Sequence, residues 1–372
     1  MITPGVIHCC HRLDQFAEGE WPFAAFALNG NLDASIDWFA LLQQQVYPAD
    51  PNVIYYYDLA TNGQARAVLP LRRIRQGWAR TLESLSNYYT SLYAPLFGPD
   101  SDPLALRRLL AAATRENGGA DVIRLAPMDP DSPSYGALMN ELRAIGWIPL
   151  TFFCFGNWFL KVEGGWADYW RERGANLRSA AKRRTQKFMA AGGSLDVIDG
   201  SDAAEVEAGI AAFREVYAAS WKQPEPYPDF VPSLIRLLAA RDMLRLGIAR
   251  LEGRAVAAQL WMAGAGKASI YKLAYREDFA AWSPGTVLTA FLMQRVIEDD
   301  RVEEVDFLIG DDAYKRLWMS SRRERRGIIA YNPRTLAGGA LLVKEMAGRL
   351  IQRGRRRLAA ARAGRHPKPD RG

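Results

Sequence analysis

The chain has 372 residues, a length that predicts either two domains or one large one. Its composition, with 49% hydrophobic and 24% charged residues, is that of a globular protein. No apolar run reaches the ~18 residues that a membrane span needs. The N-terminus lacks a charged start followed by an apolar core, which argues against a signal peptide. Three cysteines are too few for a disulfide framework, so we expect a cytoplasmic protein.

The three histidines lie near the two ends of the chain, at His8, His11 and His366. Their positions argue against Ser-His or Cys-His nucleophilic catalysis in the core. The run 8–11 contains two histidines and two cysteines, but four adjacent residues do not easily surround one tetrahedral ion. We therefore expect no metal site here, and a terminal strand or a frayed segment instead.

The net charge of +7 comes from basic residues that gather in three groups, at 171–187, 322–326 and 349–365. Clustered positive charge is typical of proteins with an anionic partner, such as a phosphorylated cofactor, nucleic acid, an anionic polysaccharide or a lipid surface. A solvated charged face is the alternative for each group. Beyond the aromatic residues at 166–170, platforms for base stacking are sparse, so nucleic acid is the less favoured partner.

The predicted secondary structure repeats along the chain. In the first half, hydrophobic periodicity predicts the order helix, hairpin, strand, helix, strand. These elements fall at residues 35–45, 52–59 with 64–72, 80–91, 104–116 and 121–128. In the second half the same order falls at residues 232–241, 243–250 with 254–262, 268–274, 284–297 and 302–309. The repetition predicts a duplicated α/β unit, with a mixed (α+β) sheet in each half.

We divide the chain into four parts. Residues 1–155 form the first unit, and 156–198 form a connecting segment that contains a basic helix at 176–191. Residues 199–335 form the second unit, and 336–372 form a basic C-terminal helix and a flexible tail. The C-terminal helix is amphipathic, which is typical of helices that dock on a membrane surface or an anionic polymer. Packing against the body of the protein is equally compatible with the pattern, and we expect it for the first half of the helix, with a free tail after Gly354.

The turn before the helix at 284–297 is the strongest candidate for a phosphate site. Ser283 is a good N-cap, and proline suits the first helical position, which Pro284 occupies. Gly285, Thr286 and Val287 would then present free backbone N–H groups at the positive end of the helix dipole, where phosphate binds favourably. A capped helix with nothing bound is the alternative. The first half has no such turn before its helix, so we expect the phosphate site in the second half.

Several short motifs occur in a fixed order. They are SIDW at 35–38, LSNYY at 85–89, NLRSAAKRRTQKF at 176–188, YAASW at 217–221, AAQL at 257–260, SPGTVL at 283–288, VDF at 305–307 and GDDAYKRLW at 310–318. In this order they resemble the CelD/BcsL-type branch of the GNAT acyltransferases, whose members are similar to the Fem-type aminoacyl transferases. The resemblance extends over residues 20–335.

The resemblance implies two GNAT-like units packed together, with the first degenerate and the second carrying the site for acetyl-CoA or another acyl-CoA. It implies a metal-free transfer to an amine or hydroxyl of a sugar- or peptide-linked acceptor, in envelope or exopolysaccharide formation. In ordinary GNAT enzymes an Arg/Gln-x-x-Gly-x-Gly/Ala turn holds the CoA pyrophosphate. Residues 281–286, AWSPGT, depart from that pattern, which leaves acyl-CoA and aminoacyl-tRNA both open as donors.

Under this hypothesis the donor thioester lies along residues 269–275, past Leu273, where a backbone N–H polarises its carbonyl. A tyrosine protonates the leaving thiolate, and the candidates are Tyr314, Tyr271 and Tyr275. A carboxylate takes the proton of the acceptor, and the candidates are Asp306, Asp311 and Asp312. Lys315 stabilises negative charge on the oxyanion or on a substrate phosphate. The expected substrate-binding residues are Asp306, Asp312, Lys182 and Trp318.

Two other classes of protein remain open from the sequence. One is an RNA-engaging protein or an aminoacyl-tRNA-dependent transferase that uses the arginine clusters. The other is a non-catalytic binding module with a degenerate site. The basic tail also allows a cytoplasmic protein that is peripheral to the inner membrane.

Overall fold

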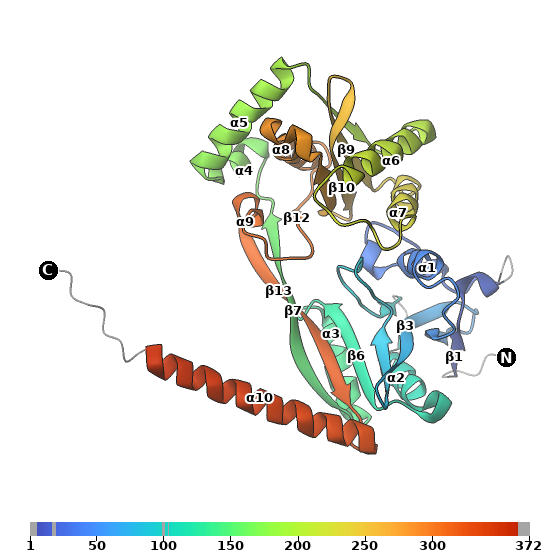
Figure 1. Cartoon of the computed structure of the whole chain (residues 1–372). Helices are drawn as coiled ribbons and strands as arrows, with labels where there is room; N and C mark the ends of the chain where they lie inside the picture. The colour runs from blue at the N-terminus through green and yellow to red at the C-terminus, as the bar shows by residue number, and fades with distance from the viewer. Residues whose placement is uncertain (1–5, 17–19, 99–100, 103, 364–372) are drawn as a thin grey trace.

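A computed structural model describes residues 6–16, 20–98, 101–102 and 104–363 (Figure 1). The described residues form one thirteen-stranded mixed sheet with helices packed against it. The strand order is β1-β2-β3-β4-β6-β13-β7-β12-β11-β10-β9-β8, with the short β5 (Leu96–Phe97) paired to β3. The expected α/β class with mixed sheets is confirmed.

The first half contains the expected elements in the expected order. They are β1 (Ile7–Cys10), α1 (Ile36–Gln45), β2 (Val53–Leu59), β3 (Ala65–Gln76), β4 (Ala79–Ser84), α2 (Ala105–Arg115) and β6 (Val122–Met128), followed by α3 (Pro133–Ala144) and β7 (Ile148–Lys161). Helix α1 begins where expected because the Ser35 hydroxyl accepts a hydrogen bond from the Trp38 N–H at 3.2 Å. The strand expected at 80–91 ends early, at Ser84. There the hydroxyls of Ser84 and Ser86 both donate to the carbonyl of Ala126, and the chain leaves the sheet.

The second half repeats the order with additional helices. Its elements are α4 (Trp166–Glu172), α5 (Ala175–Ala190), β8 (Ser194–Ile198), α6 (Ala203–Ala218), α7 (Phe230–Ala239), β9 (Leu244–Leu251), β10 (Arg254–Gly264), β11 (Lys267–Tyr275), α8 (Pro284–Glu298), β12 (Glu304–Asp306), α9 (Lys315–Trp318), β13 (Ser321–Tyr331) and α10 (Leu336–Ala363). Strand β10 is buried along almost its whole length because α6 and α8 both pack on it.

The strand expected at 302–309 is only three residues long. Strand β12 ends at Asp306, because the side chain of this residue accepts hydrogen bonds from the Leu308 N–H at 2.7 Å and from the Asn157 amide at 2.5 Å. Leu308 has a φ of +52°, a left-handed conformation that breaks the strand. The N–H of Phe307 donates to the carbonyl of Trp158, so the chain turns from β11 toward β7.

Each half gives its last strand to the other half. Strand β7 of the first half pairs with β12, and β13 of the second half lies between β6 and β7. This exchange joins the two units into a single sheet. The sequence did not predict either strand, because β13 begins as a charged run, SRRERR, and β7 shows no polar alternation.

The two halves also share a hydrophobic core. Phe230 of α7 stacks on Tyr89 with ring centroids 3.9 Å apart, and it meets Trp38 of α1 edge-on at 5.7 Å. Helices α1 and α7 contact each other across the junction. Because these rings are fully buried, the relative position of the halves is fixed by packing rather than by a linker.

Helix α10 extends away from the body (Figure 1). Its first part touches β13, and Arg349 donates to the carbonyl of Thr151 at 2.9 Å. The side chains of Val343 and Leu350 are nevertheless 69% and 62% exposed, so packing against the body covers only part of this helix. Among the described residues, no helix combines the length and the apolarity that a bilayer crossing needs.

Candidate active site

Strands β11 and β12 of the second half diverge and open a cavity that residues of the first half also line. They pair in parallel only from Lys267 to Ser269, opposite Glu304 to Asp306. Beyond this point β11 continues to Tyr275, while the segment that follows β12 turns toward β7. The space between them, which we call the splay cavity, has a volume of about 390 Å³. Its lining comprises residues 88, 89, 91, 221, 222, 270–273, 307–309, 312, 314 and 315.

Tyr314 and Lys315 lie at this cavity, at the start of α9. The Tyr314 ring meets Phe307 edge-on, with centroids 5.7 Å apart, and burial raises the pKa of its hydroxyl. Lys315 is only 5% exposed, and burial lowers the pKa of its amine. Its Nζ donates to the carbonyls of Phe307, Ile309 and Gly310. Lys315 therefore holds the cavity wall in place in addition to presenting a positive charge there.

The three candidate aspartates have different environments. Asp311 pairs with Arg322 at 2.7 Å and accepts from the Trp158 indole at 2.7 Å, and it does not line the cavity. Asp306 is 1% exposed and does not line the splay cavity, where a contact with substrate was expected. Asp312 lines the cavity, with its carboxylate 3.3 Å from the Lys315 amine. Of the three, Asp312 is the carboxylate that can reach a molecule in the cavity.

Asp306 is instead the centre of a buried ion network. Its Oδ2 lies 2.8 Å from the Lys267 amine and 2.7 Å from the Arg323 guanidinium. Burial alone would raise the pKa of this carboxyl, but Lys267 and Arg323 outweigh burial and lower the pKa to about 2. A carboxylate with so low a pKa is a poor proton acceptor at neutral pH.

The tyrosines of β11 lie at two different places. Tyr271 lines the splay cavity, but its hydroxyl donates to the Tyr89 carbonyl at 3.0 Å, and burial raises its pKa well above the ordinary value. Tyr275 lies beyond the cavity, where its ring packs beside Trp221 and against Gly285. Leu273 lines the cavity between them. Of the three candidate tyrosines, Tyr314 is therefore the best placed to donate a proton.

A second polar cluster at the cavity was not predicted from the sequence. The Lys272 amine lies 2.5 Å from the Glu225 carboxylate, and it sits over the rings of Tyr88 and Tyr89 at 4.8 and 5.0 Å. Lys222 also lines the cavity, and burial lowers the pKa of its amine. Glu225 belongs to a proline-rich loop between α6 and α7, and nothing in that loop's sequence distinguishes it. The LSNYY motif was the one available signal, since it contains both tyrosines.

The turn at the start of α8 differs from the expectation. Ser283 has a φ of +51°, and its side chain caps no backbone group. The N–H groups of Thr286 and Val287 both donate to the Ser283 carbonyl, at 3.0 and 3.2 Å. The prediction that these two groups are free is therefore wrong. The helix does begin at Pro284. Gly285 is the remaining candidate donor, and the closest heavy atom to an added Cβ there would be Cδ1 of Tyr275, at 3.2 Å.

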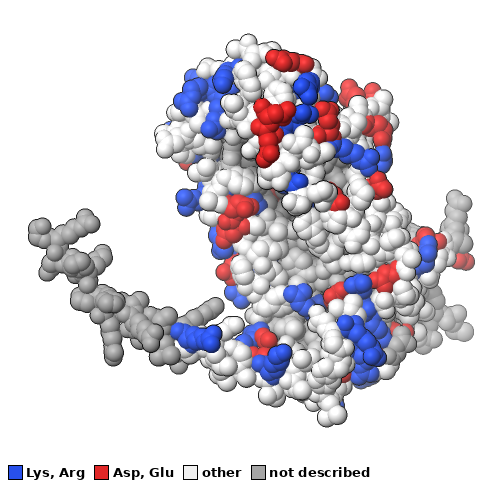
Figure 2. Space-filling model, in the orientation of Figure 1, with Lys and Arg blue, Asp and Glu red and all other residues white. Residues whose placement is uncertain are grey.

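Helix α5 brings basic residues to this same turn. The Arg184 guanidinium is 3.4 Å from the Thr286 hydroxyl, and the Lys187 amine lies 4.5 Å above the Trp282 ring. Figure 2 shows basic side chains gathered over α5. Lys182, an expected substrate ligand, is exposed on this helix and does not line the splay cavity.

Trp318 belongs to the hydrophobic core and not to the cavity. It is 5% exposed, and its carbonyl accepts from the Tyr169 hydroxyl at 3.0 Å and from the Arg173 guanidinium at 3.0 Å. Its expected contact with substrate stays a prediction, although the residue does not line the splay cavity. The residue instead attaches α9 to α4, which positions the neighbouring Lys315.

Comparison with known proteins agrees with this geometry. Residues 175–316 match the family described as acetyltransferase (GNAT) domain, and no curated protein matches the chain. The crystal structure of FemX is 12% identical, covers 87% of this chain and 97% of its own, and has a TM-score of 0.56. A conserved protein of unknown function from Bacteroides thetaiotaomicron is 11% identical, with coverages of 83% and 95% and a TM-score of 0.52.

A third similar structure is the C-terminal domain of a putative lysylphosphatidylglycerol synthetase from Agrobacterium fabrum. It is 13% identical, with coverages of 84% and 91% and a TM-score of 0.50. At these identities the three structures show the fold alone. The match of residues 175–316 to the GNAT acetyltransferase domain supports an acyltransferase. The CelD/BcsL branch stays a prediction.

Proposed function

We propose that this protein transfers an acyl group from acyl-CoA directly to an amine or hydroxyl of a sugar- or peptide-linked acceptor. The divergence of β11 and β12 is the observation that carries the proposal. It exposes the edge of β11 beyond Ser269 in a cavity that also holds Tyr314 and Asp312. An extended thioester can lie along that edge, where a backbone N–H can polarise its carbonyl.

The chain has suitable groups for the diphosphate end of the donor. Strand β11 leads from the cavity, past Leu273, to Tyr275, which packs on Gly285 at the start of α8. Arg184 and Lys187 add positive charge at that turn. A helix N-terminus with neighbouring cations attracts a diphosphate. The residues therefore fit acyl-CoA as the co-substrate, even though Thr286 and Val287 offer fewer free donors than expected.

The transfer needs no enzyme-bound intermediate. In the proposed reaction the acceptor nitrogen or oxygen forms a bond to the thioester carbon, and the carbon–sulfur bond then breaks. Asp312 takes the proton that the acceptor loses, and Tyr314 gives its proton to the leaving thiolate. Lys315 and Lys222 place positive charge near the developing oxyanion. Proton exchange with water restores both side chains.

Calorimetric titration with acetyl-CoA tests the proposal. We expect wild-type protein to bind and Gly285→Trp to lose binding, because the indole would fill the turn beside Tyr275. Gly136→Trp is the matched control, since its site on α3 is open and distant from the turn. Absence of acetyl-CoA binding in the wild type would refute the acyl-CoA donor. Tight, salt-sensitive RNA binding would then favour aminoacyl-tRNA.

We also propose that α10 docks this enzyme on an anionic membrane surface, at the cytoplasmic face of the inner membrane. Val343, Leu350 and Ile351 form an exposed apolar side, and Lys344 and Arg353 are exposed beside it. This combination complements anionic headgroups above acyl chains. Pairing with α10 of a second copy would bring the same positive charges together, which disfavours that occupant. Such docking would suit an acceptor in envelope or exopolysaccharide formation.

A further inference from the structure

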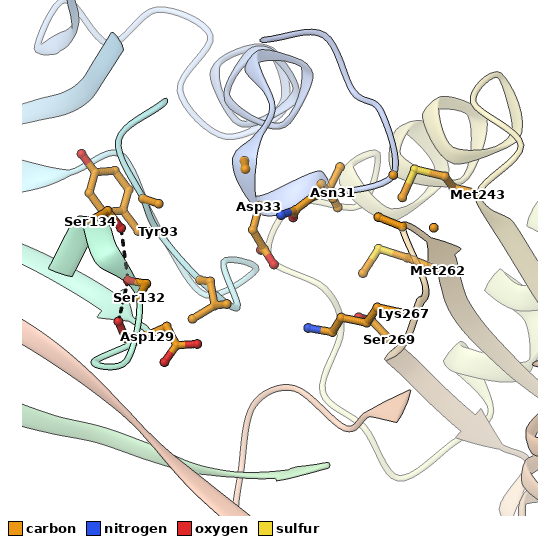
Figure 3. Close-up of a pocket in the computed structure, with 17 residues that line it drawn as sticks. Asn31, Asp33, Tyr93, Asp129, Ser132, Ser134, Met243, Met262, Lys267 and Ser269 are labelled. Atoms are coloured by element: carbon orange, nitrogen blue, oxygen red, sulfur yellow. Dashed lines mark hydrogen bonds between the residues drawn. The ribbon is translucent and has the colours of Figure 1, made fainter. Parts of the chain in front are cut away.

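A second cavity lies at the junction of the two halves, next to the splay cavity. We call it the junction cavity, and its volume is about 280 Å³. The first half contributes residues 30–34, 92–94, 129, 132 and 134, and the second half contributes 243, 262, 264, 265, 267 and 269. Figure 3 shows the carboxylates of Asp33 and Asp129 and the amine of Lys267 directed toward the space between the halves.

Only one of these three charged groups lacks a partner of opposite charge. Asp129 pairs with Arg325 at 2.6 Å, and Lys267 pairs with Asp306 at 2.8 Å. Asp33 accepts a hydrogen bond from the Ser91 hydroxyl at 2.9 Å but forms no ion pair with any of the residues that the structure describes. Asp33 is partly buried, and burial raises the pKa of its carboxyl although the charge of Lys267 lowers it. A cationic ligand beside Asp33 would favour the ionised carboxylate.

The junction cavity and the splay cavity adjoin at Ser91 and along β11. Ser91 lines the splay cavity, and the carboxylate that it hydrogen-bonds, Asp33, lines the junction cavity. Strand β11 passes both, since Lys267 and Ser269 line the junction cavity and the next residues, 270–273, line the splay cavity. A molecule bound in the junction cavity therefore lies next to the part of β11 along which the thioester is proposed to bind.

The backbones of the two halves approach closely at the glycines of the junction cavity. Gly30 has a φ of +77°, and a Cβ added there would lie 2.8 Å from the Ala265 nitrogen. A Cβ on Gly264 would lie 2.8 Å from the Gly30 Cα. The backbones of the two halves thus touch at this point, which only glycine allows. This contact lies beside the lining residues Asp33 of one half and Met262 of the other.

We propose that the junction cavity binds the acceptor of the transfer, and that this acceptor carries an ammonium group separate from its nucleophile. This inference rests on the proposed function. Asp33 binds the ammonium, and Met243 and Met262 contact the carbon skeleton. The nucleophilic amine or hydroxyl then extends past Ser91 into the splay cavity, where Asp312 takes its proton. The substrate class is an amino alcohol, an amino sugar or a diamine.

Binding of two matched small molecules tests this assignment. The probes are trans-4-aminocyclohexanol and trans-1,4-cyclohexanediol, which share one ring and differ by an ammonium in place of a hydroxyl. We expect saturable binding of the amine by ligand-observed NMR at neutral pH, at least tenfold tighter than binding of the diol. Asp33→Asn keeps an acceptor for the Ser91 hydroxyl but removes the charge, so it should abolish the preference. Ser134→Ala, in the same cavity, should retain it.

The outcomes of these experiments distinguish a failure of the acceptor site from a failure of the proposed acyl-CoA donor. Equal binding of the two probes, no binding of either, or a preference that survives in a folded Asp33→Asn variant would overturn the acceptor site. Titration of the same proteins with acetyl-CoA reports the donor site on its own. Donor binding without amine preference refutes the junction cavity alone. Amine preference without donor binding refutes the acyl-CoA proposal and leaves a cation site at Asp33.

Discussion

Replacing Asp306 by asparagine should destabilise the fold by about 2.5 kcal/mol at neutral pH. The buried carboxylate accepts hydrogen bonds from Asn157 and Leu308 and pairs with Lys267 and Arg323, which together bring its pKa to about 2. The ordinary value is 3.8. A difference of about 1.8 in pKa, at about 1.36 kcal/mol for each pKa unit, gives the expected loss. In the variant Arg323 loses Asp306 as a partner but still pairs with Glu304. This pair limits the free-energy cost of leaving the Arg323 charge partly buried.

The pH dependence identifies the cause of this loss. Because the folded pKa lies below the unfolded one, the stabilisation is complete above about pH 4 and disappears as the pH falls toward about 2. Urea unfolding of both proteins should show the full difference in free energy of unfolding at pH 7 and about half of it at pH 3. Asp311→Asn is the control, because Asp311 pairs with Arg322 at the protein surface. It should leave the urea midpoint of unfolding almost unchanged. Equal stability of wild type and Asp306→Asn at pH 7, or a gap that persists undiminished at pH 3, would refute the reasoning.

Two further predictions concern catalysis and location. Tyr314→Phe should lower kcat on the order of 100-fold with acetyl-CoA affinity unchanged, since only the proton donor is lost; an unchanged kcat in steady-state assays would remove its proposed role. Leu350→Glu should reduce flotation of the full chain with vesicles that contain phosphatidylglycerol on the order of tenfold or more, because an apolar contact is replaced by a like-charged group. Gln352→Glu, which adds the same charge without removing an apolar side chain, should reduce flotation less, and equal losses in the two variants would contradict docking through the apolar side.

Local chemistry in the sequence determined most of the elements around the site. The Ser35 cap, the hairpin with Asn62-Gly63 and the start of α8 at Pro284 were all predictable, because each depends on residues close together in the chain. Periodicity also predicted the repeated order of helices and strands, since burial of one face imposes a period on each element. The GDDAYKRLW motif contains Tyr314, Asp312 and Lys315, which line one cavity; their roles there stay predictions.

Tertiary structure alone decided which of the chosen residues face that cavity. Asp306 and Trp318 resemble their polar and aromatic neighbours in sequence, but ion pairs and core packing from distant strands remove them from it. Lys272 and Glu225 come together from segments 47 residues apart, and no local pattern encodes such a contact. The exchange of β7 and β13 is also invisible in sequence, because hydrogen bonds between strands depend on the partner and not on the strand itself. That exchange joins the two halves into one sheet, and the cavity at Asp33 lies at their junction.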